Sequence, residues 1–189
     1  MERPLIRRLT PADADLFAAG VAILNDAQGS NLFPPEYLEV RTADSDSAVW
    51  VALLGEAVVG IGVAQLVREF DFYAAFDPAI TTELAGQTAG SFATLAFVPQ
   101  WRGRGLGQEI SRERLAWLRE RGCKVILGIS WVSGLGHTSD RVFEKSGFRA
   151  VKRVDDFFVD WSLNKPDFVC PVCGAPPCRC SAIFYRRDL

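Results

Sequence analysis

The sequence predicts an α/β fold in which helices pack against a sheet, and three stretches carry this prediction. Residues 91–121 hold a short apolar run, a turn rich in glycine and arginine, and then an amphipathic helix. Residues 48–67 form two apolar segments around Gly55 and Glu56, a two-residue turn that suits a β-hairpin. Residues 124–130 are almost continuously apolar, as in a buried strand.

Length and composition limit the classes of protein to consider. A chain of 189 residues is long enough for one large domain, or for one domain with an appendage. The net charge of −2 gives no broad basic field, so nucleic acid is not an expected partner. No apolar run reaches the roughly 18 residues of a membrane span, and residues 1–4 lack the apolar core of a signal peptide. We therefore expect a cytoplasmic protein that does not enter a membrane.

The part of the chain before the hairpin is predicted to hold a strand and two helices. Residues 5–9 form a short strand, and Thr10, which is followed by proline, predicts a helix start. That helix is expected to run through about Leu24 and to end at Asn25. A polar loop and a short helix near residues 36–41 follow.

The part after the buried strand is predicted to hold a helix, further strands and a tail. Residues 137–146 predict a short helix that ends at Gly147, a residue type common after helix C-termini. Residues 150–163 are expected to form one long strand or two short ones. We place a domain boundary next, so that residues 1–165 form the main domain and residues 166–189 a C-terminal tail.

The helix after the glycine-rich turn presents one apolar face, which we expect to dock on the sheet. Two polar residues, Ser111 and Arg114, fall inside the apolar arc, and the stem of the arginine could carry its charge out to solvent. The apolar arc consists of Leu106, Gly107, Ile110, Leu115, Trp117 and Leu118.

The glycine-rich turn has the properties of a diphosphate cradle. Its glycines let the backbone approach a ligand closely, and the free N–H groups and dipole of the following helix favour negative charge. Its arginines add fixed positive charge. The alternative is a tight strand–helix connection in which the glycines serve packing alone. A dinucleotide fingerprint would need glycine where Gln108 stands, and the Gly-Lys-Ser/Thr of a Walker loop is absent. The residues of this turn are Arg102, Gly103, Arg104, Gly105, Leu106 and Gly107.

Two motifs resemble the GNAT superfamily of N-acetyltransferases. Arg102-x-x-Gly105-x-Gly107 follows the segment 95–99, Leu-Ala-Phe-Val-Pro, in the manner of the acyl-CoA-binding motif of that family. Residues 142–148, Val-Phe-Glu-Lys-Ser-Gly-Phe, are similar to a second family segment. The resemblance implies a GNAT fold, with a mixed, mostly antiparallel sheet that splays between two central strands and is flanked by helices.

The resemblance further implies acetyl-CoA as cosubstrate and an amine as acceptor. The pantetheine arm would bond to the backbone of Leu95, Phe97 and Val98, and the diphosphate would lie on the cradle from Arg102 to Gly107. The N–H of Phe97 would polarise the thioester carbonyl while the amine attacks it directly. The acceptor could be a small molecule, an antibiotic-like polyamine, or the N-terminus or a lysine of a protein, and the enzyme could be a dimer.

The acid and base of such a reaction are less well defined by the sequence. Glu69, Asp71 and Glu83 are candidate bases in the irregular segment 68–90, which is either a surface excursion or a substrate-facing wall. The family usually has a tyrosine as general acid where this chain has Phe143, which is still expected beside the cofactor. Ser130, His137 or water could replace that acid. The alternative is a non-catalytic acyl-CoA-binding or regulatory module.

Four cysteines near the C-terminus form the second strong signal. Cys170-x-x-Cys173 places two thiolates on one cation, and Cys178 and Cys180 follow after a short turn. Four sulfur ligands predict a closed, structural zinc site that folds the tail, with disulfides or free thiols as the alternatives. A knuckle that binds protein or nucleic acid is a third reading of this segment. Cys123 is expected to be an ordinary core thiol.

Overall fold

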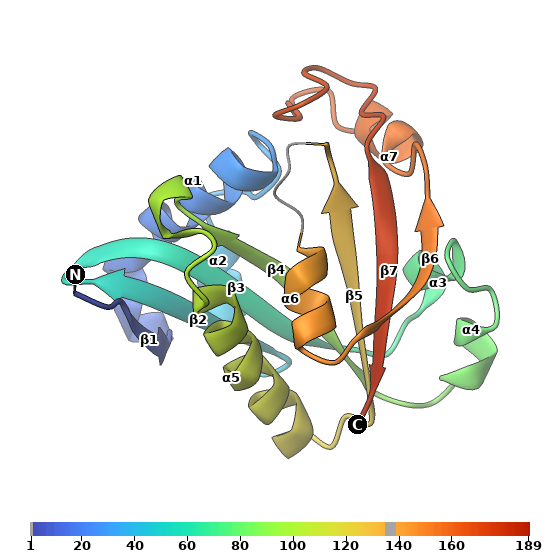
Figure 1. Cartoon of the computed structure of the whole chain (residues 1–189), viewed down its shortest axis with the longest axis horizontal. Helices are drawn as coiled ribbons and strands as arrows, with labels where there is room; N and C mark the ends of the chain where they lie inside the picture. The colour runs from blue at the N-terminus through green and yellow to red at the C-terminus, as the bar shows by residue number, and fades with distance from the viewer. Residues whose placement is uncertain (1, 135–138) are drawn as a thin grey trace.

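The computed structural model of the chain describes residues 2–134 and 139–189. These residues build one seven-stranded sheet in the order β1-β2-β3-β4-β5-β7-β6 (Figure 1). Every neighbouring pair is antiparallel except β4 and β5, which are parallel, and this confirms the predicted mixed sheet. The strands are β1 Leu5–Arg8, β2 Ser47–Leu54, β3 Ala57–Val67, β4 Ala89–Phe97, β5 Val125–Val132, β6 Arg149–Val154 and β7 Ser181–Asp188.

Helices cover both faces of the sheet, as the burial of consecutive residues along β2 and β3 requires. On β2, Val49 and Val51 pack under α1 and α2, whereas Trp50 and Ala52 pack against α5 on the other face. No described helix is both long and apolar enough to cross a membrane. The α-helices are α1 Phe17–Gln28, α2 Tyr37–Ala43, α3 Asp71–Ala74, α4 Ile80–Glu83, α5 Leu106–Glu120, α6 Asp140–Lys145 and α7 Val159–Leu163, with 3-10 turns at Pro11–Leu16 and Pro99–Trp101.

The first helix differs from its prediction at both ends. Thr10 marks the start as expected, since its N–H and hydroxyl both donate to Asp13, 2.8 and 2.9 Å away, but the first turns are a 3-10 helix. Asn25 does not end the helix. Its side-chain amide instead bonds both backbone groups of Phe33, and α1 continues to Gln28.

The irregular segment between β3 and β4 is a packing layer. It buries Phe76, Ile80 and Leu84, which lie in or close to its short helices α3 and α4, against Leu127 of β5 and Phe184 of β7. The surface-excursion reading therefore fits better than a substrate wall, because the apolar side chains of this segment face the sheet.

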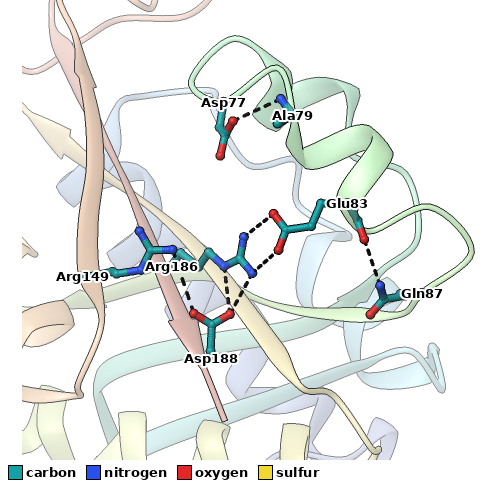
Figure 2. Close-up of polar contacts among 7 residues, drawn as sticks. All are labelled: Asp77, Ala79, Glu83, Gln87, Arg149, Arg186 and Asp188. Atoms are coloured by element: carbon teal, nitrogen blue, oxygen red, sulfur yellow. Dashed lines mark hydrogen bonds and ion pairs between the residues drawn. The ribbon is translucent and has the colours of Figure 1, made fainter.

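Glu83, one of the candidate bases, holds this layer to the sheet (Figure 2). Its carboxylate accepts two hydrogen bonds from Arg186 of β7, at 2.6 and 2.7 Å. Arg186 is a largely buried arginine that also contacts Asp188. Hydrogen bonding from Arg186 holds the pKa of Glu83 below its usual range. A carboxylate engaged in this way is a structural anchor.

The strands expected in residues 150–163 are only partly present. β6 ends at Val154, and Asp156 has a left-handed φ of 54° that turns the chain away from the sheet. The aromatic residues that follow belong to the turn and to α7, where Phe158 and Trp161 pack edge to face. The strand prediction for this part was wrong because the aromatic side chains pack on a neighbouring loop instead of in a ladder.

The segment 166–189 contributes a strand to the main sheet. Its last residues, Ser181–Asp188, form β7, which pairs with β5 on one side and β6 on the other. The cysteines thus lie in the connection between β6 and β7. Whether residue 165 divides two domains stays a prediction, but the sheet includes part of the segment assigned to the tail.

Replacing Glu83 with glutamine should lower the free energy of unfolding by about 1 kcal/mol near neutral pH, since the pair is partly exposed. The folded-state pKa of Glu83 is lowered, so its contribution is complete above the ordinary carboxyl pKa and is lost as the pH falls through the lowered value. Urea unfolding at about pH 7 and about pH 3 measures both effects. The control Glu56→Gln, in the exposed β2–β3 turn, should change neither. Equal stability of the Glu83→Gln and native proteins at neutral pH would contradict the anchoring role.

Candidate active site

The site begins where β4 and β5 separate. The two strands pair over only three positions, Gly90 to Phe92 with Ile126 to Gly128. Beyond that point β4 continues to Phe97 with β3 as its partner alone. The N–H of Val98 donates to Val59 of β3, 3.0 Å away, so by strand alternation the backbone groups of Leu95 and Phe97 point toward the gap. The predicted splay is therefore present, and it leaves one edge of β4 unpaired.

A cleft of about 460 Å³ fills this gap. Its lining residues come from β4, the glycine turn, β5 and the helices α1, α5 and α6, and Figure 1 shows where these elements lie. Of the predicted cofactor-binding residues, the structure brings these to the cleft: Leu95, Phe97, Arg102, Gly103, Gly105, Leu106, Gly107 and Phe143.

Two predicted cofactor residues are placed elsewhere. Val98 uses its N–H in the ladder to β3, so that group is not available to a ligand. Arg104 is exposed and stacks its guanidinium over Trp101, 5.0 Å from the ring centre, while its Nε donates to Gln100 O. Neither residue lines the cleft.

The glycine turn has the open backbone that a cradle needs. Gly103 and Gly105 have φ values of 70° and 86°, and the space beside both is empty. The carbonyl of Gly105 accepts from the N–H groups of Gln108 and Glu109 at 3.0 and 3.2 Å, which starts α5 directly after the turn. Arg102 donates from Nε to Phe97 O, 3.0 Å away, and this bond fixes its guanidinium between the end of β4 and the turn.

Two further cations line the cleft from α6. Arg141 and Lys145 lie one helical turn apart, and both line the cleft together with Arg102. Gln108 fixes this helix against α5 by donating to Val142 O, 3.1 Å away. The sequence analysis missed both cations, although their four-residue spacing on a short predicted helix was a readable signal.

Arg114 is buried and does not reach solvent as expected. Only 2% of it is exposed, and it donates to Thr94 O at 3.2 Å and, more weakly, to Val63 O at 3.4 Å. These carbonyls flank a bulge in which β4 carries the extra residue Ala93. Its guanidinium also lies 3.8 Å from the centre of the Phe92 ring. Burial lowers the pKa of Arg114 to about 9, so it stays charged at neutral pH.

Phe143 closes the inner end of the cleft. Its ring stacks on Tyr185 at 4.7 Å with an interplanar angle of 6°. It also rests on Gly128, where an added Cβ would lie 2.3 Å from the ring. Tyr185 is buried and does not line the cleft, and burial together with the neighbouring Asp140 raises the pKa of its hydroxyl.

The other predicted catalytic residues differ in their distance from the cleft. Ser130 is buried and accepts a hydrogen bond from Ser139, a cleft residue, at 3.0 Å. Glu69 and Asp71 are exposed and follow Val67, which pairs with the first residue of β4, at the far end of that strand. His137 lies outside the described residues. The described residues that line the cleft include no carboxylate.

The four predicted metal ligands form one cluster. The sulfur atoms of Cys170, Cys173, Cys178 and Cys180 all lie within 4.8 Å of one another. A backbone loop holds the first pair, with hydrogen bonds of 2.9 Å in both directions between Cys170 and Gly174. None of the cysteines is in a disulfide, and Cys123 is buried as expected.

Comparison with known proteins identifies the family. The model of the acetyltransferase (GNAT) family matches residues 19–148. The chain belongs to the GNAT acetyltransferase family. The aminoglycoside N(6')-acetyltransferase type 1 of Stenotrophomonas maltophilia is 28% identical over 153 residues, which cover 80% of this chain and 90% of that protein. This GNAT protein is accordingly an acyltransferase.

Solved GNAT structures share the fold of this acetyltransferase. Arabidopsis thaliana NAA60 in complex with acetyl-CoA has a TM-score of 0.67 at 16% identity, over 98% of both chains. The ribosomal-protein-alanine N-acetyltransferase of Brucella melitensis has a TM-score of 0.63 at 21% identity, over 98% of this chain and 99% of the other. Acetyl-CoA is the donor expected for this family.

Changing Arg102 to glutamate should weaken acetyl-CoA binding about tenfold or more, because it would replace the predicted charge-assisted phosphate contact with repulsion. Calorimetric titration of acetyl-CoA measures the dissociation constant. Arg112→Glu is the matched control, since it makes the same charge change on the exposed face of α5. Equal losses of acetyl-CoA affinity in both variants would mean that the overall charge of the protein, and not a contact at Arg102, is responsible. Unchanged affinity in Arg102→Glu would place the diphosphate elsewhere.

Proposed function

We propose that this acetyltransferase moves the acetyl group of acetyl-CoA to a primary amine of a small, amine-rich molecule, by direct attack in a ternary complex. The observation that carries the proposal is the unpaired edge of β4, which leads directly into a cation-lined glycine turn. An edge whose backbone groups have no strand partner suits the amides of pantetheine, and the turn suits a diphosphate. No other part of the cleft combines these two features among the described residues.

The donor half of the site is assigned to specific residues. Arg102 and the amides of the glycine turn would hold the diphosphate, with Arg141 and Lys145 adding positive charge from α6. The backbone of Leu95 and Phe97 would bind the pantetheine arm. The Phe97 N–H points into the gap and would stabilise the oxyanion that forms when the amine attacks the thioester.

Proton transfer in this mechanism runs through water and hydroxyl groups. An alkyl amine with a pKa of about 10 must lose a proton before it attacks, and the described lining supplies no carboxylate to take it. The leaving thiol has a pKa of about 8.5, so it departs as a thiolate without a strong acid. Phe143 is therefore compatible with catalysis. We assign the hydroxyl of Ser139, which pairs with Ser130 at 3.0 Å, as a relay that gives its proton to the thiolate while it accepts one from water.

The acceptor class rests on the Stenotrophomonas relative, an aminoglycoside acetyltransferase that the chain matches over 90% of its length. Aminoglycosides carry several primary amines on a compact polar scaffold. A binding module without catalysis is not favoured, because the family and this relative are both enzymes. We assign the acceptor to amino sugars and similar polyamines.

The purified protein should release CoA from acetyl-CoA when an aminoglycoside with a 6'-amine is added. The rate at low acceptor concentration should rise with pH, since only the neutral amine attacks. A thiol-reactive dye follows CoA, and mass spectrometry identifies the acetylated product. The matched control is an analogue with a 6'-hydroxyl. Release with peptides but with no small amine would overturn the acceptor class, and no release with any amine would overturn the reaction.

We also propose that the four cysteines bind one structural zinc ion. In a tetrahedral site with Zn–S bonds of about 2.3 Å, neighbouring sulfurs lie about 3.8 Å apart. The sulfurs of Cys170 and Cys180 are 3.8 Å apart, and those of Cys173 and Cys180 are 3.6 Å apart. The Val172 N–H donates to the Cys170 sulfur at 3.5 Å, a polar contact that suits a thiolate ligand. With four protein ligands, the metal would have no open position for substrate.

Protein purified without added metal should contain about one zinc per chain, as measured by mass spectrometry of the metal. Cys173→Ser should lose most of it, because one ligand of four is removed. Cys123→Ser, a buried thiol outside the cluster, should keep it. A metal-free native protein, or one whose zinc survives the Cys173 change, would rule out this site.

A further inference from the structure

The connection that carries the cysteines does more than join β6 to β7. We name residues 164–180 the cysteine module. Cys170, Cys178 and Cys180 are buried in it around Phe168, and Leu32, Trp131 and Trp161 pack against this small core. Leu32 follows α1 and Trp131 belongs to β5, so the module contacts two elements far from it in sequence.

The first contact fixes the end of α1. Ser30 and Val169 form a two-way backbone bridge, with N···O distances of 3.0 and 3.2 Å. The side-chain amide of Asn31 donates to Asp167 O, 2.8 Å away. Gly29 lies so close to the Phe168 ring that an added Cβ would be 2.3 Å from it. The residues directly after α1 are therefore held by the module.

The second contact fixes the end of β5. Ser181 and Ala182, directly after the module, pair with Val132 and Trp131. The side chain of Trp131 also packs against the small core that includes Cys180. The module thus sets the position of Trp131 through both the ladder and this packing contact.

Both fixed elements supply walls of the cleft. Gln28, the last residue of α1, lines it and donates to Thr94 Oγ1 at 2.6 Å and Leu95 O at 3.3 Å. Trp131 lines it from β5, three residues beyond Gly128, which pairs with Phe92. These walls lie on elements other than the glycine turn and α5, which seat the donor. Gln28 and Trp131 lie beside the gap between β4 and β5, where the two strands diverge.

We infer that the cysteine module is a metal-dependent clamp on the acceptor end of the cleft, joining the end of α1 to Trp131 so that the amine substrate binds between them. The inference rests on the proposed acetyl transfer and on the proposed zinc site. Metal binding orders the module, and the module orders the two walls. The donor cradle, built from the local turn and α5, needs no contribution from it.

The test compares the zinc-loaded native protein with Cys173→Ser and Asn31→Ala. Cys173→Ser should raise the KM for the amine about tenfold and change the dissociation constant of acetyl-CoA less than about twofold. Asn31→Ala keeps all four cysteines and its zinc, and should raise the amine KM by about threefold through the broken bond to Asp167. Cys123→Ser is the control that should change neither constant.

Hydrogen exchange gives a readout that does not depend on activity. In Cys173→Ser, amides of residues 28–33 and 130–132 should exchange faster, while those of α5 should not change. Two results in Cys173→Ser would overturn the clamp. One is unchanged hydrogen exchange at residues 28–33. The other is a loss of acetyl-CoA affinity as large as the rise in the KM for the amine. If the native protein acetylates no amine, the proposed function fails, and the exchange pattern still decides whether the metal holds the two walls.

Discussion

The early separation of β4 from β5 is the constraint on which the site depends. Three paired positions hold the strands together, and every later backbone group of β4 on that side lacks a strand partner. Such groups are costly to bury unless a ligand or side chain bonds them. Gln28 and Arg102 bond the carbonyls of Leu95 and Phe97 at the edge, which leaves the N–H groups facing the cleft. Behind the edge, Arg114 satisfies the carbonyls around the bulge from inside the core.

The two halves of the cleft are built by different means. The donor half is local, because the strand, the glycine turn and the start of α5 follow one another within residues 95–107. The opposite half is assembled from α1, β5 and the cysteine module, which are far apart in sequence. Glycine allows close approach at two points around the cleft. Gly128 admits the ring of Phe143 and Gly29 admits the ring of Phe168.

This difference explains how much the sequence could predict. The sheet class and the glycine turn between strand and helix were predicted correctly, since each is encoded by a short local pattern, and Phe143 lines the cleft. The burial of Arg114 was missed because a helical wheel shows which way the side chain points but not that backbone carbonyls lie there to accept its hydrogen bonds. Helix α7 and the pairing of β7 were missed because aromatic residues and a short apolar strand fit several partners until the fold selects one. Glu69 and Asp71 failed as cleft residues because sequence proximity to β3 does not show which end of β4 they approach.

The position of the cysteine module gives a physical reason for a metal in a GNAT domain. The module spans residues 164–180 and buries few apolar side chains, so its own core is too small to offset the entropy of ordering it. Yet its two ends are constrained, since β6 and β7 are neighbours in the sheet. The proposed cation, bound by four sulfurs, would replace the missing core at one point and fix the loop there. Because Cys180 directly precedes β7 and Trp131 packs against the cysteine core, this fixed point would be transmitted to the wall of the cleft through the chain and through packing. The module is then better understood as part of the acetyltransferase site than as an independent knuckle.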